Sequence, residues 1–114
     1  MTGGNNGIGY ETTLHLALHG AKVYLAARSQ SKAMVAIERI KAINPIVQVE
    51  FLTLDLAHLQ SVHEAAEWIL HVEKVIDIIV CNAGIIAPET QLTDDGIELD
   101  FQVNYLGIKV FRMI

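Results

Sequence analysis

The chain has 114 residues, of which 52% are hydrophobic and 18% are charged, and its net charge is −5. This composition predicts one folded domain with a modest core and excludes a disordered chain. Acidic and basic residues are interspersed, so a surface for nucleic-acid phosphates is not expected. The apolar runs stay shorter than the roughly 18 residues of a membrane span, and the Gly- and Asn-rich start does not resemble a secretory signal.

Predicted helices and strands alternate along the chain. In order, they are a helix over 7–18, a strand over 23–27, a helix from Ser29 or Ser31 to about 43, a strand over 47–54, a helix over about 59–73, a strand over 75–81 and a helix from about 95 to the last residue. Gly20 is expected to end the first helix in the left-handed conformation. This order predicts a parallel sheet with right-handed crossovers.

Apolar spacing predicts which residues of the helices face the core. They are Ile8, Leu14 and Leu18 in the first helix, Met34, Ile37 and Ile40 in the second, and Val62, Ala65, Ala66, Ile69 and Val72 in the third. Cys81, the single cysteine, excludes an internal disulfide and fits a reducing, intracellular compartment, with the cytoplasm as our expectation. Its apolar neighbours predict a buried, inert thiol.

Glycines at positions 3, 7 and 9 stand directly before the first predicted helix. This spacing allows a tight turn and brings the backbone close to a pyrophosphate, which the free N–H groups of the helix can bind. Taken alone, the loop fits an ordinary turn equally well, because Gly-rich segments are common.

The end of the strand over 23–27 indicates the choice of cofactor. NAD sites place an acid there to bind the ribose 2′-hydroxyl, whereas a 2′-phosphate requires a cation. The side chain of Ala27 accepts no hydrogen bond, and Arg28 can bind a phosphate with two. With Lys32 one turn further on, NADP(H) is favoured over NAD. One alternative is that Arg28 is a solvated surface residue. Another is a methyltransferase, but that class would also require an acid at this strand end, and none is present.

Further signatures follow in order: Asp55, then Asn82-Ala83-Gly84, then Asn104-Tyr105-Leu106-Gly107. Together with the glycine loop, they resemble the N-terminal half of a short-chain dehydrogenase/reductase, and Ala27-Arg28-Ser29 is similar to the retinol-dehydrogenase-like branch. The resemblance covers nearly all of the chain. It implies an α/β fold with a Rossmann-like doubly wound parallel sheet, so that residues 1–114 form a partial NAD(P)-binding domain.

The resemblance also implies roles for individual residues. The pyrophosphate loop would comprise Gly3, Asn5, Gly7, Ile8 and Gly9, and the residues flanking the adenosine ribose would be Asn82, Ala83 and Gly84. Arg28 would bind the 2′-phosphate, and Asp55 with the Leu56 backbone would contact adenine. Asn104 would shape the active site and hold a water of the proton relay. The residues alone leave open that Asp55 is a helix N-terminal acid and Asn82 a turn residue.

The implied reaction is the NADP-dependent interconversion of a small-molecule alcohol and carbonyl compound. The family's chemistry uses a serine, a tyrosine and a lysine, held in place against the nicotinamide. Tyr105 and Lys109 match the Tyr-x-x-x-Lys spacing, but they overlap the Asn104 motif, and no serine follows Ser61. The sequence therefore disfavours a catalytic role for this pair and disfavours catalysis by this chain alone.

The two ends of the sequence lead to a further expectation. Only Met1 and Thr2 precede the glycine loop, where the family has a central strand, and the sequence stops within the helix that carries Asn104. We therefore expect a truncated fold that lacks the first strand and the C-terminal half, as in a partial gene product or an incomplete gene model. A non-catalytic nucleotide-binding module and an inactive fragment without a stable fold are the alternatives.

Two further polar pairs occur in the sequence. His15 and His19 have the spacing of helical metal ligands, but no third ligand stands at a suitable distance, so surface positions and no metal site are predicted. Asp94-Asp95 is expected at the start of the last helix, where acids complement the helix dipole.

Overall fold

The computed structural model describes residues 1–114. They form two compact units, Met1–Thr53 and Leu54–Ile114, each of which is described by itself. None of the helices combines the length and apolarity that crossing a bilayer requires.

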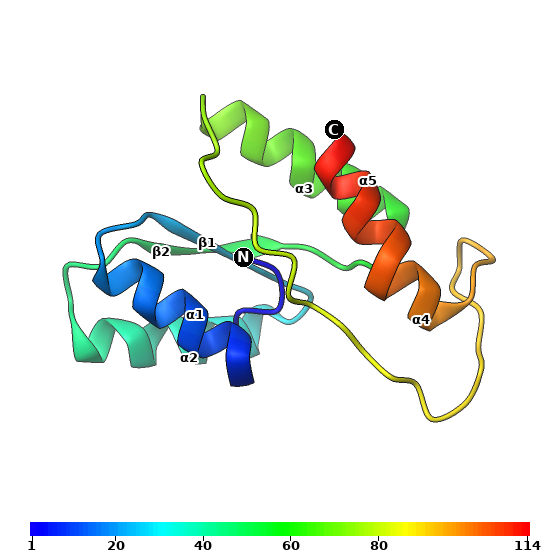
Figure 1. Ribbon diagram of the computed structural model, residues 1–114, viewed down its shortest axis with the longest axis horizontal. Helices are drawn as coiled ribbons and strands as arrows, with labels where there is room; N and C mark the ends of the chain where they lie inside the picture. The colour runs from blue at the N-terminus through cyan, green and yellow to red at the C-terminus, as the bar shows by residue number, and fades with distance from the viewer. The chain divides into compact units, whose positions relative to one another are not determined.

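The first unit is an α/β unit built on two parallel strands. Its elements are α1 (Gly7–Leu18), β1 (Val23–Ala27), α2 (Gln30–Ile43) and β2 (Val49–Thr53). The strands pair from Val23 opposite Val49 to Ala27 opposite Thr53. Both helices cover one face of the pair (Figure 1). All four elements occur where the sequence predicts them, with bounds that differ by no more than two residues.

The core of the first unit corrects the predicted inward face of α1. Ile8 is 80% exposed and Leu18 is 37% exposed, whereas Tyr10, Thr13 and Ala17 are buried. The buried residues follow the helical spacing of three and four. Because α1 is apolar on several sides, hydrophobicity alone did not reveal which side packs against β1.

The caps of the helices follow the predicted chemistry. Gly20 has φ of 90°, as expected for a helix end. Its N–H donates to the Ala17 carbonyl at 3.0 Å, and the Ala21 N–H donates to the Leu16 carbonyl at 3.1 Å, which is a Schellman arrangement. Of the two candidate serines, Ser29 caps α2 and accepts from the Lys32 N–H at 3.4 Å.

A short segment, Met1–Gly3, continues the sheet on the other side of β1. Thr2 forms a parallel bridge with Ala26. The Ala26 N–H donates to the Met1 carbonyl at 2.8 Å, and the Gly3 N–H donates to the Ala26 carbonyl at 2.9 Å. β1 is therefore hydrogen-bonded along both edges, and the glycine loop starts from a fixed point.

The second unit is mainly helical. It contains α3 (Leu59–Val72), α4 (Leu99–Phe101), the π-helix η1 (Gln102–Leu106) and α5 (Gly107–Met113). α3 packs against α5 (Figure 1). The last helical stretch begins four residues later than predicted, because Glu98 is its N-cap and accepts from the N–H groups of Asp100 and Phe101.

The predicted strand over 75–81 is wrong. The segment has no regular secondary structure, and its apolar side chains are largely exposed, with Val75 at 72% and Ile78 at 67%. Cys81 is exposed rather than buried. Apolar character makes a strand favourable only where a neighbouring strand completes the hydrogen-bonded ladder, and the sequence pattern does not report such a neighbour.

Replacing Gly4 by alanine should destabilise the first unit. A Cβ at this position would lie 2.6 Å from Thr13 Oγ1 and 3.0 Å from Leu25 Cγ. Thr13 is fully buried and its hydroxyl donates to the Gly9 carbonyl at 2.9 Å, so it cannot turn away without losing that bond. Overpacking of this kind costs about 1–3 kcal/mol.

Urea unfolding followed by circular dichroism measures this change. Gly84→Ala is the matched control, because its Cβ would meet only Asn104 Oδ1, at an ordinary 3.5 Å. Equal unfolding midpoints for the two variants would contradict the close packing at Gly4.

Candidate functional site

The glycine loop before α1 needs glycine at two positions for conformation and at one for space. Gly3 has φ of 64° and Gly7 has φ of 50°, a region that side chains rarely adopt. Gly4 is the position where a side chain does not fit, and sequence reasoning missed it. The adjacent glycines Gly3 and Gly4 are the feature of the sequence that could have indicated it. Above Gly7 there is open space, so its backbone is accessible.

The loop and Arg28 leave the sheet at the same edge. Thr2 lies opposite Ala26 in a parallel pairing, so the residues that follow Thr2 and those that follow Ala26 emerge on the same side. Arg28 is exposed at this edge, directly before the cap of α2. The structure thus brings together the loop and the arginine that the sequence assigned to one cofactor.

The first turn of α1 is open to an anion. Its N-cap, Asn6, makes no side-chain capping bond, and no acidic residue stands in the first turn. The first N–H groups of any helix lack partners within the helix and carry the positive end of its dipole. Asn5 is partly exposed and Ile8 is 80% exposed beside them, whereas Gly9 is buried.

In the second unit, Asp55 organises the entry to α3. Its Oδ1 accepts from the Ala57 N–H at 2.9 Å, and its own N–H donates to Ser61 Oγ at 2.9 Å. Leu56 is buried. A Cβ on Gly107 would lie 2.8 Å from the Leu56 carbonyl oxygen, so the start of α5 approaches this backbone as only glycine allows.

Asn104 holds the segment that follows Asn82-Ala83-Gly84. Its Oδ1 accepts from the Ile85 N–H at 2.8 Å, and its Nδ2 donates to the Ile85 carbonyl at 2.8 Å. Asn104 lies in η1, where the Gly107 N–H donates to the Gln102 carbonyl five residues back. π-helical turns of this kind occur often at functional sites. The structure therefore brings Leu56, Gly84 and Asn104 into one region.

Asp95, of the pair Asp94-Asp95, caps a different helix from the one predicted. Asp95 Oδ2 accepts from the Leu59 N–H at 2.9 Å, at the start of α3, and from Gln102 Nε2 at 2.6 Å. The hydrogen bond from Leu59, which has the larger effect, and the one from Gln102 both lower the pKa of Asp95. The prediction that acids complement a helix start was correct in chemistry, but it was assigned to the wrong helix.

His58 lies between two carboxylates. Its Nε2 is 3.2 Å from Asp94 Oδ2 and its Nδ1 is 3.2 Å from Asp55 Oδ2. Both contacts are hydrogen bonds only when both ring nitrogens carry a proton. The bond to Asp94 and the charge of Asp55 accordingly raise the pKa of His58.

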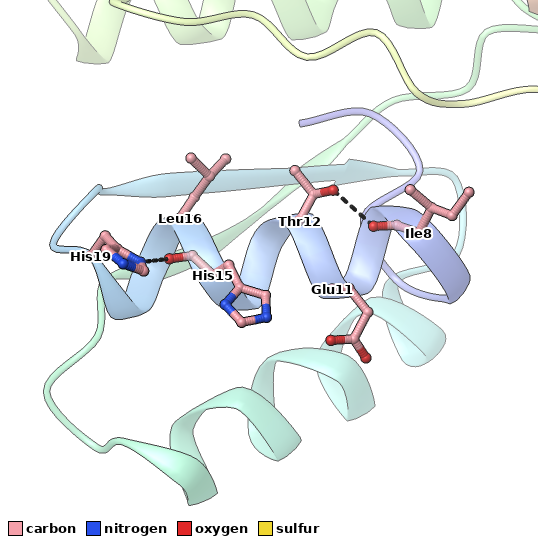
Figure 2. Close-up of a pocket in the computed structure, with 6 residues that line it drawn as sticks. All are labelled: Ile8, Glu11, Thr12, His15, Leu16 and His19. Atoms are coloured by element: carbon pink, nitrogen blue, oxygen red, sulfur yellow. Dashed lines mark hydrogen bonds between the residues drawn. The ribbon is translucent and has the colours of Figure 1, made fainter.

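The outer face of α1 carries the histidine pair (Figure 2). A shallow depression there is lined by Ile8, Glu11, Thr12, His15, Leu16 and His19. His19 Nδ1 lies 2.7 Å from the His15 carbonyl oxygen, so this ring is turned onto the end of its own helix. No group of three or more metal-ligating side chains occurs in the structure.

Tyr105 and Lys109 form a stacked pair rather than a hydrogen-bonded one. Lys109 Nζ lies 5.6 Å from the centre of the Tyr105 ring, and Phe101 contacts the same ring with a centroid distance of 5.3 Å. Tyr105 is 52% exposed.

A parallel sheet covered by helices, with a glycine loop that opens onto a helix N-terminus, defines a Rossmann-like α/β protein. The short chain dehydrogenase profile matches residues 1–113 of the chain. The chain belongs to this family.

Curated relatives of the chain are named as oxidoreductases. It is 46% identical over 107 residues to the short-chain dehydrogenase/reductase drtF of Aspergillus calidoustus, covering 94% of this chain and 34% of the relative. It is also 46% identical over 107 residues to the WW domain-containing oxidoreductase of Homo sapiens, covering 94% of this chain and 26% of the relative. The chain thus spans about a third of the length of these relatives or less.

Solved structures share the fold. An uncharacterized protein of Mycobacterium paratuberculosis superposes with a TM-score of 0.80 at 36% identity, covering 96% of this chain and 38% of that one. A short-chain dehydrogenase of Sphingobium yanoikuyae in complex with NADPH gives a TM-score of 0.80 at 26% identity, covering 99% of this chain and 44% of that one. The expected Rossmann-like fold is confirmed.

His58 should titrate above its ordinary pKa of 6.5, because two carboxylates stabilise the imidazolium. A raised folded-state pKa means that the contribution to stability is complete below about pH 6.5 and is lost as the pH rises through the folded-state value. NMR titration of the imidazole protons measures the pKa directly. Asp94→Asn should move it down towards 6.5, whereas Asp77→Asn, at an exposed carboxylate elsewhere, should not. A midpoint at or below 6.5 in the unchanged chain would contradict the bridge.

Proposed function

We propose that the chain binds NADP(H) and that it is the cofactor-binding part of an oxidoreductase that interconverts an alcohol and a carbonyl compound. One observation supports this most strongly: the glycine loop and Arg28 emerge from the same sheet edge, because Thr2 pairs with Ala26. A pyrophosphate and a 2′-phosphate belong to the same dinucleotide, so their binding groups must share an edge.

The loop fits a pyrophosphate on physical grounds. The open space above Gly7 lets a phosphate approach the backbone, and the uncapped first turn of α1 offers N–H donors without a competing acid. In this proposal Gly3, Asn5, Gly7, Ile8 and Gly9 form the phosphate loop. When bound, the nicotinamide would accept or donate the hydride of the reaction.

Arg28 would select NADP over NAD. Its exposed guanidinium can form two charge-assisted hydrogen bonds to a phosphate, and the small, buried Ala27 before it brings no acid for a ribose hydroxyl. Two relatives by structure support the choice, since a metagenomic short-chain oxidoreductase was solved with NADP at 31% identity and the Sphingobium yanoikuyae enzyme with NADPH.

Residues of the second unit have proposed roles that follow from the family resemblance. We assign adenine to Asp55 and the Leu56 backbone, and the adenosine ribose to Asn82, Ala83 and Gly84. Asn104 would shape the active site, where it already fixes the backbone of Ile85 through two hydrogen bonds.

Tyr105 and Lys109 would not act as the proton-transfer pair. The ammonium group of Lys109 lies over the face of the Tyr105 ring, a cation–π geometry that holds the lysine away from a proton-relay role at the phenol oxygen. The substrate and the direction of the reaction are not assigned.

Arg28→Ala should weaken NADPH binding by about 10- to 100-fold, the range expected for the loss of a charge-assisted bidentate contact. NADH binding should change by less than about threefold, because NADH lacks the 2′-phosphate. Isothermal titration calorimetry with both cofactors measures the difference.

Arg112→Ala is the matched control, since Arg112 is an exposed arginine of α5. It should leave both affinities unchanged. If the unchanged chain binds NADPH and NADH equally, Arg28 does not select the cofactor. If it binds neither, the proposed function of this chain is wrong.

A further inference from the structure

Asp100 makes a contact that the family resemblance does not explain. The Ala87 N–H donates to its carboxylate, 3.0 Å from Oδ1 and 3.2 Å from Oδ2. One helical turn later, Asn104 binds both the N–H and the carbonyl of Ile85. Two side chains on one helical stretch therefore hold the backbone on both sides of a single residue, Ile86.

Ile86 is the most exposed large hydrophobic side chain of the protein, at 94%. Its neighbours Ile85 and Ala87 are partly buried. An isoleucine in a loop tied down at only one end would be free to turn its side chain against the protein. Here the hydrogen bonds on either side hold the backbone that carries Ile86, and its side chain is exposed.

The simpler explanation for an acid at this position is capping of its own helix, since Asp100 stands in the first turn. Glu98 already has that role, because its carboxylate accepts from the N–H groups of Asp100 and Phe101. The Asp100 carboxylate is directed at Ala87 instead. Its contact is between segments 13 residues apart in the chain.

We propose that Asp100 is a positioning residue: together with Asn104 it fixes the segment Ile85–Ala87 that continues from Asn82-Ala83-Gly84, so that Ile86 is presented to a bound ligand. The effect on ligand binding rests on the proposed function, in which Asn82-Ala83-Gly84 flanks the cofactor ribose. The fixation of the backbone does not rest on it and can be measured without any ligand.

The first measurement is amide hydrogen exchange at Ala87 in the ¹⁵N-labelled chain of 114 residues. Asp100→Ala removes the acceptor and should speed the exchange of this amide by about 10-fold or more, since hydrogen bonds to charged groups are among the stronger ones. Asp100→Asn keeps an acceptor oxygen and should restore exchange to within about threefold of the unchanged chain. Asp77→Ala, at an exposed carboxylate that does not contact the segment Ile85–Ala87, is the matched control.

The second measurement keeps the test informative if Asp100→Ala does not fold. It compares the Ala87 amide in the unchanged chain and in Asp100→Asn, both of which keep an acceptor oxygen at position 100. The Ala87 amide should be protected from exchange in the unchanged chain, because its N–H donates to the Asp100 carboxylate. An Ala87 amide that exchanges as fast as a free amide in the unchanged chain would overturn the proposal.

The third measurement is NADPH affinity, with Asp100→Ala expected to bind about three- to tenfold more weakly than Asp100→Asn. Equal affinities, with Ala87 exchange altered as expected, would overturn the effect on the ligand and leave the fixation of the backbone. A chain that binds no NADPH at all would overturn the proposed function, while the exchange results would still decide the role of Asp100.

Discussion

The first unit depends on the short parallel pairing of Met1–Gly3 with β1. Three backbone hydrogen bonds, from Met1 N, Ala26 N and Gly3 N, fix the relative positions of two chain segments. The position of the glycine loop follows from that alignment. The alignment determines where the glycine loop leaves the sheet, and it directs α1 back across the face that α2 also covers. Gly4 can then pack against Thr13 and Leu25, which ties the loop to the core.

The second unit is held together in a different way. Its long irregular stretch is fixed by side chains that bind backbone groups: Asn104 at Ile85, Asp100 at Ala87 and Asp95 at Leu59. Such contacts satisfy backbone polar groups that a sheet would otherwise satisfy. Because each of these contacts depends on one side chain, a single substitution can remove it, whereas the bonds of a strand ladder are made by backbone groups.

Local signals predicted much of the fold. Gly20, Ser29 and the apolar spacing of α3 gave correct ends or faces, because caps and periodicity act over a few neighbouring residues. Val62, Ala65, Ala66 and Ile69 are buried as expected, although Val72 is 42% exposed. The prediction of a strand over 75–81 was wrong because strand formation depends on residues far away in the chain, which local signals do not report. The predicted start of the last helix was wrong because the Asp95 carboxylate accepts from the Leu59 N–H of α3 instead.

The residues of the candidate site differ in the same way. Gly3, Gly7 and Arg28 could be proposed from the sequence, because glycines before a helix and a cation after a strand are local signals. Asp100 and His58 could not, since the partner of Asp100 lies 13 residues away and one of the two partners of His58, Asp94, lies 36 residues away. The assignment of individual residues to parts of the cofactor stays a prediction.

The π-helix η1 has a consequence for how this sequence can change in length. A π turn contains one residue more than an α turn, so deleting a single residue from Gln102–Leu106 would restore regular α geometry. Five residues in a π turn and four in an α turn carry the chain through similar total rotations, so the residues after the deletion would keep nearly their present orientation. Gly107 would therefore stay against the Leu56 carbonyl, where only glycine fits. The extra residue of η1 thus changes which side chains this stretch presents, Asn104 among them, without moving the glycine that follows.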